Sequence, residues 1–219
     1  ISWEITREKI LHVEAEAGGT KQSAIFQNPL ANEELNEDVL NMLKAKSAFN
    51  KSILDGNGRP SVAATVTYAN SAAEAQHWRL AAEMLEAAER LTPGRDHAID
   101  ICYYYSMDGD DKKRHKWARI AYERNACAIT AYNLALSEFD ADNKNAYCEL
   151  MEECLLFDPN YTAALVSYGT FLKNSGDTTG VDYLERAIKL LKEDLSLGIL
   201  NDADYSRFRR AAQILGKTK

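Results

Sequence analysis

The sequence has no apolar run near the roughly 20 residues that a membrane-spanning helix needs, and it shows no signal peptide. A basic excess is also missing, because 33 acidic residues stand against 26 basic ones, for a net charge of -7. Phosphate neutralisation needs a basic surface, so this balance argues against a nucleic-acid-binding protein. The basic segment 112–116 follows Asp108, Asp110 and Asp111, which largely cancel its field. We therefore expect no nucleic-acid partner, no membrane partner and a cytoplasmic location.

Motifs for catalysis and for metal binding are lacking too. The cysteines form no CxxC pair and have no histidine at zinc-ligand spacing, so we interpret them as buried residues in a reducing compartment; they are Cys102, Cys127, Cys148 and Cys154. The four histidines are scattered, and no GxSxG, HExxH or phosphate-binding loop occurs. We expect no catalytic residue, no metal site and no cofactor in this chain. An enzyme with an unrecognised site is a remote alternative.

What the first 31 residues contain is an alternation of apolar and polar side chains. Trp3 and Ile5 fall on one face of a short run, and similar runs follow at 10–15 and 22–27. Polar or glycine-containing turns separate these runs. The pattern predicts a three-stranded antiparallel β-meander, which is marginally stable without a neighbour.

Residues 32–59 predict a connecting helix followed by a linker. Asn32 is a suitable N-cap, with Glu33 and Glu34 in the first turn. Apolar residues then recur near the helical period as far as Phe49. Segment 55–60 contains two glycines and a proline, which end the helix.

Residues 60–219 contain a repeat. Small residues recur 33 positions apart, at Ala88, Ala121, Cys154 and Ala187. Residue pairs at 68–69, 101–102, 134–135 and 168–169 recur at intervals of 33 or 34. Gly109 and Gly176 fall where each unit would turn between two helices. The repeat predicts helical hairpins that stack on one another, because one hairpin cannot bury its apolar face alone.

These repeats resemble tetratricopeptide repeats (TPRs), which place large and small residues at fixed positions on two helices. The closest matches are Ala81, Leu85, Ala88 and Pro93 in one unit and Tyr168, Gly169, Leu172, Gly176, Gly180, Leu184 and Ala187 in another. Departures occur in the middle units, where Arg114 and Tyr147 replace small residues and Ala126 replaces the proline. The resemblance implies a superhelix with a concave groove.

A last helix is expected over residues 203–215, starting at Asn201-Asp202. Its arginines, Arg207, Arg209 and Arg210, suit a solvent-facing cap of the stack. The expected fold class is therefore mainly α: a TPR-like α-α superhelix of about four helical hairpins plus a capping helix, preceded by a small antiparallel β-meander. The expected domains are 1–31, 32–59 and 60–219.

A second resemblance concerns the start of the chain. Segments 1–5, 10–15, 21–25 and 28–35 resemble the end of the substrate-binding β-domain of DnaK-type heat-shock chaperones, although Lys9 replaces a usual glycine. This similarity covers about a sixth of the chain. It implies an ATPase domain and a peptide pocket upstream, with ATP as the cofactor of that upstream domain only. No residue of either site can be assigned to this chain.

First helices line the groove of a TPR stack, and they supply the candidate partner-binding residues: Asn70, Asp100, Tyr103, Tyr132, Asn133, Leu136, Thr170 and Lys173. Aromatic rings beside amides suit an extended peptide. The alternative is that Tyr103, Tyr132 and Leu136 pack between helices. Some TPR proteins grip the carboxylates of chaperone C-termini, but we expect no such clamp here, because Asp100 would repel a carboxylate.

Together these patterns predict a protein–protein interaction module with a protein or peptide in its concave groove. The two resemblances combined indicate the C-terminal part of a DnaK-type chaperone-like protein. The alternative is a stand-alone TPR adaptor. The sequence leaves the oligomeric state open.

Overall fold

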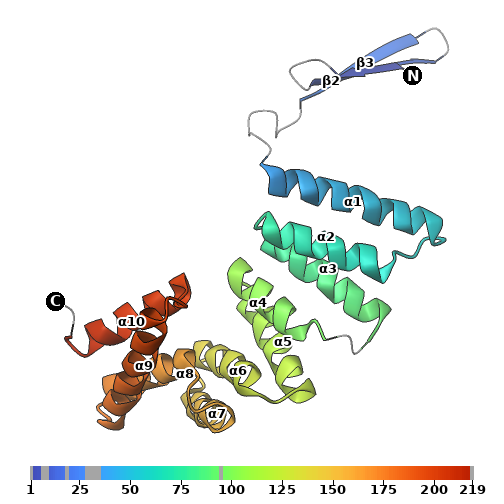
Figure 1. Ribbon diagram of the computed structural model, residues 1–219. Helices are drawn as coiled ribbons and strands as arrows, with labels where there is room; N and C mark the ends of the chain where they lie inside the picture. Colours follow the sequence, from blue (N-terminus) through green and yellow to red (C-terminus); the bar gives the residue numbers. More distant parts are fainter. Residues whose placement is uncertain (1, 6–9, 18–19, 28–35, 94–95, 218–219) are drawn as a thin grey trace. The chain divides into compact units, whose positions relative to one another are not determined.

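The computed structural model of the chain describes residues 2–5, 10–17, 20–27, 36–93 and 96–217. Figure 1 shows their elements. The strands are β1 (Ser2–Ile5), β2 (Ile10–Ala17) and β3 (Thr20–Gln27). The described helices are α1 (Glu37–Asp55), α2 (Val62–Glu74), α3 (Trp78–Leu91), α4 (Ala98–Asp108), α5 (Asp111–Arg124), α6 (Ala128–Asp140), α7 (Lys144–Phe157), α8 (Thr162–Asn174), α9 (Thr179–Ser196) and α10 (Asp202–Ile214).

The strands form one sheet in the order β1-β2-β3, with both pairs antiparallel. In its register, Leu11 pairs with Ile5 on one side and with Phe26 on the other. In the helices, the buried side chains are mostly small or apolar and form the core of the helical repeat.

The chain divides into two compact units, Ile1–Ala81 and Ala82–Lys219. In the first, α1 packs along α2, where the rings of Phe49 and Tyr68 lie 5.7 Å apart between centroids. Helix α1 is capped by Asn36, whose side chain accepts a hydrogen bond from the backbone N–H of Val39. The expected cap Asn32 lies outside the described residues. The predicted boundaries at residues 31 and 59 stay a prediction.

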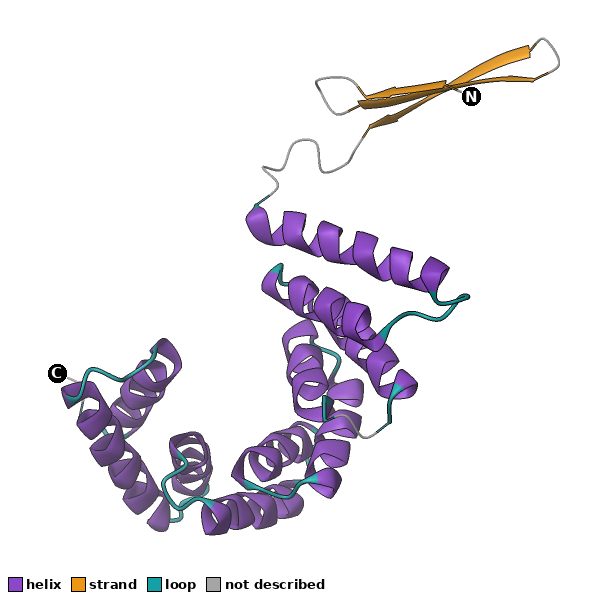
Figure 2. Ribbon diagram, turned by 45° about the vertical axis from the view of Figure 1, so that its right-hand side comes forward, coloured by secondary structure: helices purple, strands orange, loops and turns teal. Residues whose placement is uncertain are grey.

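The second unit contains three helical hairpins, α4/α5, α6/α7 and α8/α9, and ends with α10, which packs on α8 and α9. Figure 1 labels these helices in chain order, and Figure 2 shows them from another side. Asp110 caps α5 by accepting a hydrogen bond from the N–H of Lys113. Gly109 and Gly176 have φ values of 79° and 85°. Glycine adopts such angles without a Cβ clash, so both turns lie where the sequence placed them.

Small side chains allow the helices of this unit to approach closely. Three residues of the predicted series, Ala121, Cys154 and Ala187, are at most 2% exposed. A Cβ added at Gly180 on α9 would lie 2.5 Å from the carbonyl oxygen of Gly169 on α8. The repeat spacing therefore marks real helix contacts in this unit, as the sequence predicted.

A half-buried carboxylate links neighbouring helices. One oxygen of Glu86 on α3 accepts hydrogen bonds from the Tyr105 hydroxyl on α4 (2.9 Å) and from the Trp117 indole N–H on α5 (2.8 Å). These bonds compensate the carboxylate for lost water and fix the relative rotation of the three helices.

Candidate functional site

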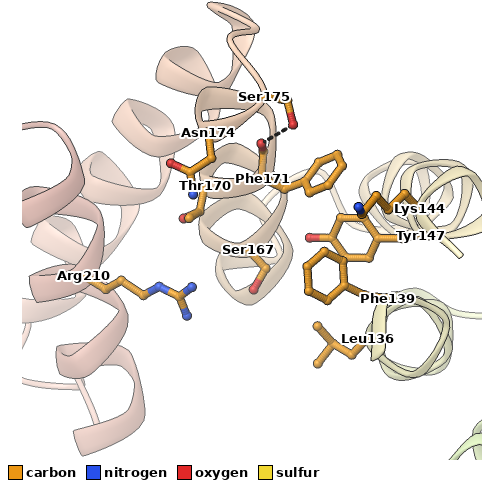
Figure 3. A pocket seen from close by; sticks show the side chains of 10 residues that line it. All are labelled: Leu136, Phe139, Lys144, Tyr147, Ser167, Thr170, Phe171, Asn174, Ser175 and Arg210. Atoms are coloured by element: carbon orange, nitrogen blue, oxygen red, sulfur yellow. Dashed lines mark hydrogen bonds between the residues drawn. The ribbon is translucent and has the colours of Figure 1, made fainter. Parts of the chain in front are cut away.

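The second unit contains a cavity of about 450 Å³ among α6, α7, α8 and α10. Its lining consists of Leu136, Phe139, Lys144, Tyr147, Ser167, Thr170, Phe171, Asn174, Ser175 and Arg210. In Figure 3 the aromatic side chains gather on one side, and Arg210 reaches from α10 toward α8 on the other. The cavity thus combines an apolar wall with a cationic one.

Three rings form the apolar wall. Phe139 and Phe171 meet edge to face at 6.0 Å between centroids, and each lies 5.0 Å from the ring of Tyr147. Burial raises the pKa of the Tyr147 hydroxyl well above its usual range, while Arg210 opposes this rise. Tyr147 is buried and fixes the wall, whereas Phe139 is 42% exposed and can contact a ligand.

Polar groups from α8 face the other side of the cavity. The hydroxyls of Ser167 and Tyr132 lie 3.2 Å apart and share a hydrogen bond. Thr170 donates its hydroxyl to the carbonyl of Val166 at 2.6 Å, so its oxygen keeps only acceptor capacity for a ligand. Arg210 forms no ion pair with any residue in the described part of the chain.

A smaller hollow of about 190 Å³ adjoins the first along α6, α8 and α10. It is lined by Tyr132, Ala163, Val166, Ser167, Ser206, Arg207 and Arg210. Ser167 and Arg210 line both hollows, so Arg210 lies where they meet. The two hollows form one surface, which we call the α6–α8–α10 surface.

Three predicted groove residues lie on this surface. Leu136 and Thr170 line the larger hollow, and Tyr132 lines the smaller one. Tyr132 also packs edge to face on Tyr161 at 5.4 Å, so it serves the core as well as the surface. Asn133 is half-buried on α6 and lies in the sequence between Tyr132 and Leu136, which line the hollows.

The other predicted residues lie elsewhere. Asp100 and Tyr103 are exposed on α4, where the Tyr103 ring contacts that of Tyr104. Lys173 is exposed, but its ammonium donates to the carbonyl of Ile214 at 2.9 Å. Asn70 is exposed on α2, in the first unit. Whether these positions bind a partner stays a prediction.

The residues that sequence reasoning missed come from helix ends and from α10. Phe139 continues the stripe of Tyr132 and Leu136 by one further turn of α6, a spacing that could have revealed it. The arginines of α10 were expected to face solvent as a cap. Arg209 and Arg210 are exposed as expected, and Arg207 is half-buried. Because α10 packs on α8, however, Arg207 and Arg210 also line the hollows, which the sequence did not predict.

The cysteines and acidic groups form no catalytic constellation in the described residues. All four thiols are free, with Cys102 and Cys154 buried as expected and Cys127 and Cys148 only half-buried. Among the residues described, no three His, Cys, Asp or Glu side chains are placed to hold a metal ion. No described helix is long and apolar enough to cross a membrane.

Comparison with solved structures defines the class of this fold as a TPR-like helical repeat. A crystal structure of MamA covers 71% of this chain and 92% of its own, with 13% identity and a TM-score of 0.54, and a second MamA structure covers 68% and 95% with a TM-score of 0.51. YrrB, described as a TPR protein with an unusual peptide-binding site, covers 77% and 93% at 13% identity and a TM-score of 0.53. No protein-family profile and no curated protein matches the chain.

These matches correct the expected fold class. The matched fold is an all-helical TPR-like repeat, so placing an antiparallel β-meander in the fold class was wrong. Strands β1–β3 pair with one another in a sheet that precedes the helices in the chain, and the repeat itself consists of helices. The comparisons also give no support to the resemblance with DnaK-type chaperones.

Proposed function

We propose that this chain is a protein–protein interaction module that binds an extended peptide segment on the α6–α8–α10 surface. The observation that carries this proposal is the larger cavity, where the exposed Phe139 forms an aromatic wall with Tyr147 and Phe171, and polar groups of α8 lie opposite. Such a cavity accepts an apolar side chain, while hydroxyl and amide groups bind the peptide backbone. The described residues that line this surface supply binding groups, and among them no nucleophile is paired with a base.

The comparisons support this proposal at the level of the fold. YrrB is described with a peptide-binding site, which is a property of YrrB and supports the same class of ligand here. They favour a stand-alone TPR adaptor over the C-terminal part of a DnaK-type chaperone, because the matched structures are TPR proteins. We further propose that the chain is not an enzyme, takes no cofactor, and binds neither nucleic acid nor membrane.

A matched pair of variants tests the proposal. Random-sequence peptides are selected on the full chain, and the selected peptides are then measured against Phe139→Ala and Phe157→Ala. These two phenylalanines are similarly exposed, at 42% and 47%, but Phe157 lies at the end of α7 and outside both hollows. Truncating a central aromatic contact typically weakens binding by about 2 kcal/mol, or roughly 30-fold.

We expect that loss in Phe139→Ala alone, with melting temperatures that match between the two variants. Equal affinity of both variants for every selected peptide would place binding elsewhere and refute the proposal.

A further inference from the structure

The charge of the α6–α8–α10 surface is opposite to that of the chain as a whole. The chain carries a net charge of -7. Among the described residues that line the two hollows, the charged ones are Lys144, Arg207 and Arg210, and none is a carboxylate. An acidic protein thus presents a cationic lining at this surface, which favours an anionic group on the ligand.

Of these three cations, Arg210 is the one left for a ligand. The guanidinium of Arg207 is paired with Asp204 on the same helix, and the Lys144 ammonium lies 3.3 Å from a carboxylate oxygen of Asp142. Arg210 is exposed and pairs with no residue that the structure describes. Its planar guanidinium can bind a carboxylate through two parallel N–H···O bonds.

The position of Arg210 also indicates where along the ligand the acid lies. Arg210 and Ser167 line both hollows, so a chain that occupies both continues on either side of Arg210. An acidic residue inside the peptide fits this arrangement, whereas a terminal carboxylate would leave one hollow empty. The aromatic wall lies in the larger hollow, on one side of Arg210 (Figure 3).

From this juxtaposition we infer that the bound segment carries an internal Asp or Glu that pairs with Arg210, next to an aromatic or aliphatic residue that enters the cavity of Phe139, Tyr147 and Phe171. The inference rests on the proposed function and names its ligand class: an acidic, extended segment of a partner protein with an apolar anchor.

The test uses randomised peptide libraries with blocked ends, captured by the immobilised full chain. In the first library Phe is fixed and Asp occupies one of the next two positions; in the second Asn replaces Asp, and in the third Ala replaces Phe. We expect the first library to be retained at least about tenfold more than the second, the size expected for a charge-assisted hydrogen-bonded pair. It should also be retained more than the third, which lacks the apolar anchor.

Two arginine variants of the full chain test whether Arg210 is the residue that pairs with the acidic side chain of the peptide. Arg210→Gln removes the preference for Asp over Asn, while Arg209→Gln keeps it, because Arg209 is exposed on the same helix but lines neither hollow. Equal retention of the Asp and Asn libraries, with Phe139→Ala still lowering both, would overturn the inference and leave the proposed function standing. Retention that depends on neither Phe nor Phe139 would overturn the proposed function itself.

Two further outcomes would also overturn the inference. Peptides that bind only when their C-terminus is free would assign Arg210 to a chain end. A concentration-dependent dimer of the full chain that Arg210→Gln dissociates, without any retained peptide, would assign the surface to a second copy of this chain.

Discussion

Replacing Gly180 by alanine should open the contact between α8 and α9. The new Cβ would lie 2.5 Å from the Gly169 carbonyl oxygen and 2.5 Å from the backbone nitrogen of Lys173. Both are backbone atoms that cannot rotate away, and ordinary contact begins at 3.4 Å, so the helices must separate by about 1 Å. Overpacking lowers the free energy of unfolding by about 1–3 kcal/mol. The better helix propensity of alanine offsets at most about 1 kcal/mol of this loss.

We therefore expect a net loss near 2 kcal/mol, since the clash involves two backbone atoms. For a chain of this size that lowers the melting temperature by about 4–8 °C in a thermal scan followed by circular dichroism. Gly169→Ala attacks the same contact from the other side, where its Cβ would lie 2.9 Å from the Gly180 carbonyl oxygen. The double variant should lose less than the sum of the two single losses, because one separation relieves both clashes.

The control is Lys189→Ala, an exposed substitution on α9 that should change stability by less than about 0.5 kcal/mol. An unchanged or higher melting temperature in Gly180→Ala, with the control behaving as expected, would show that the two helices do not meet this closely.

Two further predictions concern titratable groups. The hydrogen bond to Glu153, followed by burial, raises the pKa of Tyr122 from 10.0 to about 12, so the stability it contributes is complete below pH 10.0 and is lost as pH rises through about 12. Tyr122→Phe should reduce the fall in melting temperature between pH 10.0 and about pH 12, and an unchanged fall would contradict this assignment. Partial burial acts to raise the pKa of Cys127, but hydrogen bonds from Thr130 and Ile129 outweigh it and lower that pKa, whereas burial raises the pKa of Cys154 to about 12. Because the thiolate is the reactive form, a short iodoacetamide pulse at about pH 8 should label Cys127 before Cys154, and equal labelling in peptide mass spectra would contradict it.

Much of the repeat could be predicted because its signals are local or periodic. The spacing of Ala121, Cys154 and Ala187 follows from packing, because these positions must be small for the helices to approach. Turn glycines such as Gly109 follow from the backbone, because the turn needs a positive φ.

The candidate site was less predictable, because it depends on where separate helices meet. Arginines on a last helix are typical of a solvent-facing cap, and only the packing of α10 on α8 shows that Arg210 borders a cavity. Lys173 looked available for a partner, but it binds the Ile214 carbonyl, 41 residues away in sequence. Contacts of that range leave no periodic trace in a single sequence.

Calorimetric titration of one selected peptide into the two phenylalanine variants measures whether the α6–α8–α10 surface binds a peptide. We expect a wild-type affinity for Phe157→Ala and roughly 30-fold weaker binding for Phe139→Ala, the usual size of a central aromatic contact. Equal affinities, or a larger loss in Phe157→Ala, would show that the peptide binds elsewhere, since Phe157 lies outside both hollows.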